Sequence, residues 1–199
     1  MIDEGYIKFE CVWTEDTAIP DEEIADLIEW RNRLCRAGLI GHDAALDVGF
    51  GNISRREPGA RGFVISATRT GHVPVATGHE FTRVVDYDIA ANRVVCRGPR
   101  QASSESLTHA AIYELDSAYL AVAHAHSRDL WRSLAGEVPT TDAGIAYGTA
   151  EMAGEFLRLY RDDDLREARI AVMGGHEEGL ISIGTTVKEA AERLLSLCS

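Results

Sequence analysis

The chain has 199 residues, of which 45% are hydrophobic and 26% charged, a composition typical of one globular domain with a sizeable core. Its formal net charge is −12, and this acidic excess disfavours nucleic-acid binding, which needs a positive surface to displace counterions. No run reaches the roughly 18 apolar residues that span a membrane, and Met1–Gly5 does not resemble a signal peptide. The four cysteines form no C-x-x-C pair, which indicates reduced packing residues. We therefore expect a cytoplasmic protein without nucleic-acid or membrane partners.

The first half of the chain predicts one helix among short strands. A strand is expected over Ile7–Trp13, and Asp21 is expected to cap a helix that ends near 38–41, because its apolar residues keep helical spacing. A glycine-rich strand and turn follow over 45–54. Further strands, separated by Gly, Pro and Asn, are predicted at 62–66, 81–87 and 93–96.

Helices and apolar strands alternate in the second half. Helices are predicted at 103–115, after Ser127, at 149–160, and after Thr186, which with Glu189 forms a capping box. Strands are predicted at 118–126, 168–173 and 180–183. Residues 1–199 are therefore expected to form a single α/β domain, with a central, mostly antiparallel sheet between helical layers. Residues 1–20 form an N-terminal extension to which the sequence assigns no role.

Histidines at the ends of two predicted strands suggest a metal site. His124 and His126 alternate in an apolar strand, so both imidazoles project from one face. A catalytic zinc site needs three protein ligands, and His176 in Gly-Gly-His-Glu-Glu-Gly could supply the third. Spacing alone leaves open whether these histidines bind metal or are structural residues.

Other polar segments lie where strands end or helices begin. Gly51-Asn52 falls in a glycine turn, 68–71 (Thr-Arg-Thr-Gly) in a loop, and Ser103-Ser104-Glu105 at a predicted helix start. Backbone N–H groups at such places bind anions. Each segment also has a structural interpretation, as tight turns, an N-cap at Ser104, and a favourable carboxylate at Glu105.

Taken together, these segments resemble the class II aldolase/adducin family. The resemblance covers about Asp21 to Leu197, and it rests on five segments in the family's order: Gly-Asn-Ile-Ser (51–54), Thr-Gly (70–71), Ser-Ser-Glu (103–105) with His109 and Tyr113, His-Ala-His (124–126) and Gly-His (175–176). It implies the family's sheet between helical layers and a homotetramer whose active sites lie between subunits.

The resemblance also implies a role for each motif. His124, His126 and His176 are implied as ligands of a divalent metal, with Zn²⁺ favoured and Mn²⁺, Co²⁺ or Fe²⁺ as alternatives. Glu105 is implied as the acid/base carboxylate. Asn52 with Gly51, Gly71, Ser103 and Ser104 are implied as the cradle of a substrate phosphate, to which Thr68 or Thr70 adds a hydroxyl.

The resulting functional hypothesis is a metal-dependent aldolase that acts on a phosphorylated ketose through an enediolate. Alternatives that use the same site are a sugar-phosphate 4-epimerase, a dehydratase or a decarboxylase of a hydroxy-carbonyl compound, and a non-catalytic adducin-like module is a third interpretation. The aldolases' helper tyrosine falls near Ala143 and the epimerase aspartate on Gly144, so the helper residue is unassigned. Asp142 and Glu177 are the other candidate bases.

Overall fold

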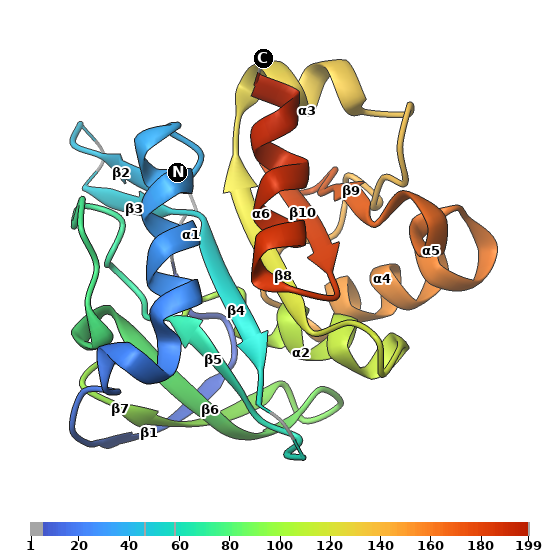
Figure 1. The fold of residues 1–199 in the computed structure, drawn as a ribbon. Coiled ribbons are helices and arrows are strands. Elements are labelled where there is room, and N and C mark those ends of the chain that lie inside the picture. Colours follow the sequence, from blue (N-terminus) through green and yellow to red (C-terminus); the bar gives the residue numbers. More distant parts are fainter. Residues whose placement is uncertain (1–5, 46, 58, 199) are drawn as a thin grey trace.

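The computed structural model has the predicted fold, an α/β domain whose large, mostly antiparallel sheet lies between helical layers (Figure 1). It describes residues 6–45, 47–57 and 59–198. Residues 1–5, to which the signal-peptide expectation applies, and Leu46 of the predicted 45–54 segment lie outside this range.

Within the described residues, eight strands form the main sheet, in the order β1-β7-β6-β5-β4-β8-β10-β9. Only β1 and β7 run parallel, and every other neighbouring pair in this order is antiparallel. A separate hairpin joins β2 (Gly41–Asp43) to β3 (Val48–Phe50). The strands of the main sheet are β1 (Glu10–Glu15), β4 (Asn52–Arg56), β5 (Phe63–Ser66), β6 (Phe81–Asp88), β7 (Arg93–Gly98), β8 (Ala121–His126), β9 (Ile170–Val172) and β10 (Gly179–Gly184).

Helices pack on both faces of the sheet. One face is covered by α1 (Ala25–Arg36) and α6 (Val187–Leu195), which also contact each other. The other face is covered by α2 (Ser106–Leu115) and α4 (Ala150–Asp162), with the short α5 (Leu165–Ala168) beside α4. The remaining described helical segments are α3 (Arg128–Leu134) and the 3-10 turns η1 (Asp21–Ile24), η2 (Gly78–Glu80) and η3 (Ser196–Cys198).

Strand β8 shows how the two cores are separated. Its alanines at 121, 123 and 125 pack in the cluster under α1 and α6, whereas Val122 packs in the cluster under α2 and α4. Because side chains alternate along a strand, His124 and His126 share the face of Val122. Both histidines are therefore directed into the layer that contains α2.

Three predictions about where strands and helices begin differ from the structure. The strand predicted over Ile7–Trp13 is β1 at Glu10–Glu15, because an edge strand pairs with its neighbour β7 through the backbone and can include polar side chains. The Asp21 cap prediction is wrong, since Pro20 holds the cap position of η1 and the Asp21 carboxylate accepts the Gly78 N–H at 2.7 Å. Residues 103–105 form a turn, and α2 begins only at Ser106.

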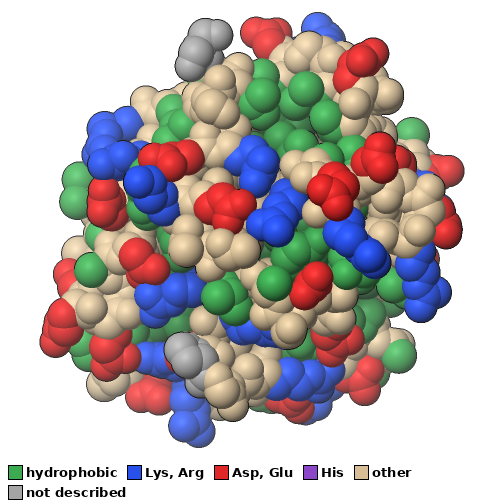
Figure 2. Space-filling model, turned by 45° about the vertical axis from the view of Figure 1, so that its right-hand side comes forward, with side chains coloured by type: hydrophobic (Ala, Val, Ile, Leu, Met, Phe, Trp, Pro, Cys, Tyr) green, Lys and Arg blue, Asp and Glu red, His purple; other side chains and the backbone are tan. Residues whose placement is uncertain are grey.

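Acidic and basic side chains are interspersed over the face shown in Figure 2, with apolar residues between them. On this face the charges therefore form no continuous basic surface of the kind that nucleic-acid-binding proteins present. Among the described residues, no helix is both long and apolar enough to cross a bilayer.

Candidate metal centre

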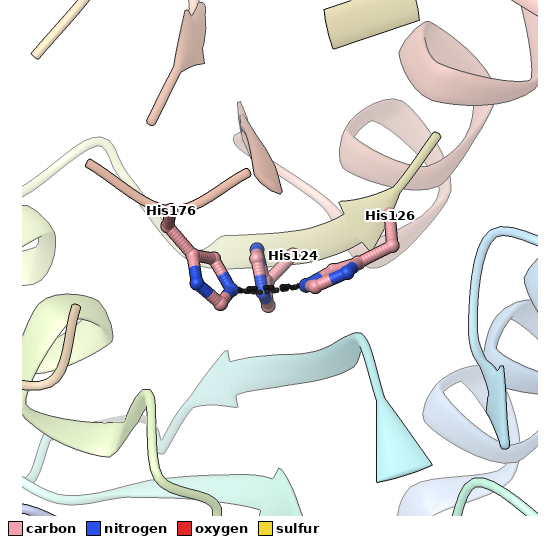
Figure 3. Close-up of side chains that lie close together, drawn as sticks. All are labelled: His124, His126 and His176. Atoms are coloured by element: carbon pink, nitrogen blue, oxygen red, sulfur yellow. Dashed lines mark hydrogen bonds between the residues drawn. The ribbon is translucent and has the colours of Figure 1, made fainter. Parts of the chain in front are cut away.

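The imidazoles of His124, His126 and His176 point toward a common centre (Figure 3). The first two come from β8, and His176 comes from the turn between β9 and β10. The Nε2 atom of His126 lies 3.1 Å from that of His124 and 2.9 Å from that of His176, and the third Nε2–Nε2 distance is 3.3 Å. Nitrogens that coordinate one ion tetrahedrally at about 2.1 Å lie about 3.4 Å apart. The spacing therefore fits a single metal ion.

The protonation states of the three rings also fit a metal. All three side chains are buried, and burial holds the pKa of His124 at about 4 and those of His126 and His176 well below the usual value. The Nδ1–H of His124 donates to the Leu180 carbonyl at 3.0 Å, which leaves the Nε2 lone pair directed at the centre. Hydrogen bonds among the three Nε2 atoms can occupy only some of their lone pairs. A cation at the centre would accept all three lone pairs at once.

Glu105 is a buried carboxyl group beside this centre. Its side chain is 1% exposed, and neither carboxyl oxygen has a hydrogen-bond partner among the described residues. Burial raises the pKa of Glu105 to about 7, while the nearby Thr108 hydroxyl and Lys8 ammonium lower it in part. A carboxyl group with a pKa near neutrality is suited to both accepting and donating a proton.

A cavity of about 190 Å³ joins Glu105 and His124 to the predicted cradle residues. Every residue of the predicted phosphate cradle lines this cavity: Gly51, Asn52, Thr70, Gly71, Ser103 and Ser104. The Asn52 side-chain oxygen has no hydrogen-bond partner among the described residues. The fold thus brings together segments that lie far apart in the sequence, as the motif order implies.

Thr70 and Thr68 differ in what their hydroxyls can offer. Thr70 Oγ1 donates its proton to the Ala67 carbonyl at 2.8 Å, so it can only accept from a ligand. Thr68 lines the same cavity and is the better placed of the two to donate a hydroxyl proton. The loop that carries both is held by the fully buried Arg31, which donates to the carbonyls of Thr70 (2.7 Å) and Val73.

Two glycines of the cradle occupy positions that a larger residue would disturb. Gly51 has a φ of 71°, and a Cβ there would lie 2.8 Å from the Leu39 carbonyl oxygen. A Cβ on Gly71 would collide with the Gly41 carbonyl. The close backbone approach at both sites allows the turns to surround the cavity.

The structure also places several residues near the centre that sequence reasoning did not identify. Phe50 stacks on His126 with ring centroids 5.4 Å apart, and the buried Tyr147 lies 4.4 Å from the His176 ring. Tyr6 and Arg69 line the cavity, and Arg69 adopts a positive φ of 58°. No local motif signalled these residues, because the packing of segments far apart in the sequence brings them to the centre.

Asp142 and Glu177, the other candidate bases, are not among the residues that line the cavity. Both side chains are exposed. The Asp142 carboxylate accepts the Gly144 N–H at 2.7 Å and so stabilises its own turn. The structure therefore favours Glu105 over both as the carboxyl group of the site.

Residues 32–198 match the family described as the class II aldolase and adducin N-terminal domain. The chain belongs to this family. Class II aldolases use a divalent metal, and the histidine triad supplies a donor set that fits one. Among curated proteins, none matches the sequence.

Solved structures of similar fold agree with this assignment. An L-fuculose-1-phosphate aldolase from Thermus thermophilus is 22% identical, with 87% of this chain and 88% of that chain covered and a TM-score of 0.61. YgbL from Klebsiella pneumoniae, described as a putative aldolase/epimerase/decarboxylase, is 14% identical, with coverages of 90% and 87% and a TM-score of 0.66. A further L-fuculose 1-phosphate aldolase is 18% identical, with coverages of 91% and 84% and the same TM-score of 0.66. At these identities the likeness establishes the fold.

Proposed function

We propose that this class II aldolase family member is a carbon–carbon lyase that acts on a small phosphorylated ketose with a divalent metal ion. The observation that carries the proposal is the single cavity that Glu105, His124 and the polar cradle residues share. The three Nε2 atoms within 3.3 Å of one another support a catalytic centre over a non-catalytic adducin-like module. We propose Zn²⁺ as the ion; Mn²⁺, Co²⁺ and Fe²⁺ also accept imidazole ligands.

In this proposal His124, His126 and His176 hold the ion, which when bound supplies Lewis acidity to the oxygens of a hydroxy-carbonyl substrate. Glu105 accepts the proton from the hydroxyl or carbon next to the carbonyl and later returns it. The buried position of Glu105 keeps bulk water from competing for that proton. Its raised pKa allows the carboxyl group both to accept and to donate a proton near neutral pH. The N–H groups at Gly51 and Gly71, the Asn52 side-chain amide and the Ser103, Ser104 and Thr68 hydroxyls hold the phosphate.

The proposal is tested by metal content and by proton exchange. Purified protein is loaded with each ion in turn, and exchange of solvent deuterium into a panel of ketose phosphates is followed. In Glu105→Gln, which is nearly isosteric, we expect metal content to be unchanged and exchange to fall about 10²–10⁴-fold, the usual contribution of a positioned general base. The matched control is Glu151→Gln on the first turn of α4, which is exposed. Exchange by Glu105→Gln at the parent rate would remove Glu105 from the mechanism.

The second candidate is a 4-epimerase, dehydratase or decarboxylase that uses the same metal and the same carboxyl group. It is supported by the similarity to YgbL, whose described activities include two of these reactions. The product separates the alternatives: an aldolase forms an aldehyde and a smaller ketose phosphate, an epimerase a stereoisomer, a dehydratase water, and a decarboxylase carbon dioxide. Loss of activity in Asp142→Asn or Glu177→Gln, with Glu105→Gln active, would favour a reaction with a different base.

We also propose a homotetramer in which neighbouring subunits approach the centre, as the family resemblance suggests. Several large apolar side chains are exposed in the isolated subunit, including Val75 at 68% and Val85 at 46%. Light scattering at micromolar concentration tests the assembly, and a monomer there would reject it.

A reducing compartment such as the cytoplasm is the proposed location. The four cysteines are free, although the Cys11 and Cys96 thiols lie only 3.7 Å apart on neighbouring strands. A pair at this distance would be prone to oxidation in a secreted protein.

A further inference from the structure

His176 is held differently from the other two histidines of the centre. His124 and His126 lie within β8, where β10 pairs along one side and fixes their register. His176 lies outside any strand, in the turn after β9, a strand of three residues at one edge of the main sheet. The contacts that support this turn from outside therefore decide where the third imidazole lies.

The 139–147 loop, which precedes α4, provides such support. Its residue Thr141 donates the backbone N–H to the Val172 carbonyl of β9 at 3.0 Å. The Thr141 hydroxyl oxygen accepts the N–H of Gly174, the second residue after β9, at 2.9 Å. The loop is thus hydrogen-bonded both to β9 and to the turn that carries His176.

The same loop also packs against the turn and against the imidazole itself. A Cβ on Gly174 would collide with the Thr141 carbonyl, and one on Gly175 would collide with the Ile145 carbonyl. The ring of Tyr147 lies 4.4 Å from the ring of His176. With backbone this close to backbone, a displacement of the loop displaces the turn or opens space behind the imidazole.

Two charged residues of α4 hold the loop by its backbone. The carboxylate of Glu155, which is 9% exposed, accepts the N–H of Asp142 at 2.7 Å. The guanidinium of Arg158, one turn further along α4, donates to the Thr140 carbonyl at 3.2 Å. Because α4 is anchored in the core by buried apolar side chains, it offers the loop a rigid support.

The charge of Glu155 strengthens its hold on the loop. The hydrogen bond from Arg158 lowers the pKa of Glu155, and that from Asp142 adds to the effect against the opposing influence of burial. The group is therefore ionised at neutral pH, and a hydrogen bond to a carboxylate is stronger than one to a neutral acceptor. An ion pair three residues apart on a helix contributes little to the helix by itself. The bond to Asp142 is the contact of Glu155 that reaches beyond α4.

We infer that Glu155 is a positioning residue of the metal centre, which fixes the 139–147 loop through the Asp142 N–H and thereby fixes the turn that carries His176. The inference rests on the proposed metal site. Glu155 touches neither the ion nor the substrate in this assignment. It acts through the loop on the one ligand that the strand register of β8 does not place.

The test measures metal binding by the full chain. In Glu155→Ala we expect calorimetry to give a zinc affinity weakened about 10-fold, at the lower end of what outer partners of metal ligands contribute. With Co²⁺, which imidazole sites also accept, the visible absorption spectrum should change because the His176 ring is no longer held in place. Glu155→Gln keeps an oxygen that accepts the Asp142 N–H. It should restore most of the zinc affinity and the parent cobalt spectrum, although the ion pair with Arg158 is lost.

Glu189 on α6 offers a matched control, because its carboxylate makes the same kinds of contact. It accepts the backbone N–H of Thr185 at 2.8 Å and pairs with Arg193 on its own helix. Thr185 follows the last residue of β10, at the end of that strand opposite to the His176 turn. Urea unfolding of Glu189→Ala should show a loss of stability, whereas its zinc affinity and cobalt spectrum should be those of the parent.

The outcomes separate this inference from the proposed function. Failure of the parent to bind zinc would show that the metal site itself is wrong. If the parent binds zinc, the inference is overturned by a parent-like zinc affinity in Glu155→Ala, by equal weakening in Glu189→Ala, or by failure of Glu155→Gln to restore the affinity. Thr141→Val, which removes the acceptor of the Gly174 N–H at nearly constant volume, decides the matter if Glu155→Ala does not fold. It should also bind zinc more weakly, and parent-like binding would overturn the inference.

Discussion

Asn52 lies directly opposite His124 in the antiparallel register of β4 and β8. On the other side of β8, Gly179 of β10 lies opposite His126, three residues after His176. A cradle residue and the two predicted ligands on β8 are thus positioned by adjacent strand pairs, while His176 lies in the turn that leads into β10. Because backbone hydrogen bonds fix this register, the distances in the centre do not depend on flexible loops alone.

His126→Ala should abolish tight metal binding and leave the fold intact. The imidazole contributes the Nε2 atom that is nearest to both other ligands, at 3.1 and 2.9 Å, so its loss leaves only two donors. Metal analysis after dialysis should find no stoichiometric ion, and added zinc should no longer raise the melting temperature, as a ligand that binds only the folded state does in the parent. His79→Ala, at an exposed histidine of η2, should behave like the parent. Retention of one zinc per chain by His126→Ala would contradict the three-histidine site.

Gly51→Ala should destabilise the protein by a combination of backbone strain and collision. The left-handed backbone alone costs on the order of 1 kcal/mol for a residue with a Cβ, and the contact with the Leu39 carbonyl adds to this. Gly59 offers a matched control, because it has the same φ of 71° and nothing lies within 4 Å of its Cβ position. Urea unfolding should therefore show a larger loss for Gly51→Ala than for Gly59→Ala. Equal losses would mean that the close approach at Gly51 relaxes without cost.

Part of the arrangement at the candidate centre can be predicted from the sequence, because it follows local rules. Alternation along an apolar strand is enough to place His124 and His126 on one face, and Gly51-Asn52 is a recognisable turn. The partner strands, however, are separated by tens of residues, and no local pattern states that β4 lies beside β8. The family's motif order supplied that long-range information.

The parts that sequence reasoning missed depend on tertiary contacts. Asp21 is of a residue type that often caps helices, yet its carboxylate accepts a hydrogen bond from the backbone N–H of Gly78, which lies 57 positions away. Tyr6 lies in a segment with no motif, and only tertiary contacts, such as that of its backbone N–H with the Tyr147 hydroxyl, bring it to the cavity. Ser103–Glu105 are residue types typical of a helix start. However, the Ser106 N–H and hydroxyl both donate to the Ser103 carbonyl, which closes a separate turn, and α2 begins at Ser106.

Arg31→Met should loosen the loop that carries Thr68, Thr70 and Gly71 while leaving the metal ligands in place. The fully buried guanidinium donates to two loop carbonyls, and each carbonyl left without a partner costs about 1–3 kcal/mol. We expect a large loss of stability and weaker binding of inorganic phosphate, with zinc stoichiometry unchanged. Arg33→Met on the same helix removes a half-exposed pair with Glu29 and a guanidinium contact with the Trp30 ring, and it should cost about 1–2 kcal/mol at most. A phosphate affinity that stays at the parent value in Arg31→Met would show that the loop does not form the anion site.

Glu105→Gln should stabilise the metal-free protein, and by more as the pH rises. The pKa of Glu105 is about 7 in the folded chain against an ordinary value of 4.5, so between these pH values the folded state binds more protons than the unfolded state. The stabilising contribution is therefore fully present below pH 4.5 and is lost as the pH rises through 7. At about 1.4 kcal/mol for each pH unit of the shift, the loss is on the order of 3 kcal/mol. Because glutamine carries no charge at any pH, the Glu105→Gln variant does not undergo this loss of stability.

The measurement is urea unfolding with a chelator present, at about pH 4.5 and about pH 8. The difference in unfolding free energy between Glu105→Gln and the parent should be small at the lower pH and should favour the variant at the higher pH, while the histidine contributions, common to both proteins, cancel. Glu151→Gln, at an exposed position, should show the same small difference at both pH values. A difference between Glu105→Gln and the parent that does not change with pH would mean that the buried carboxyl group titrates at its ordinary value. The reversible proton transfer assigned to Glu105 near neutral pH would then lose its physical basis, because a carboxyl group of ordinary pKa is a much poorer proton donor there.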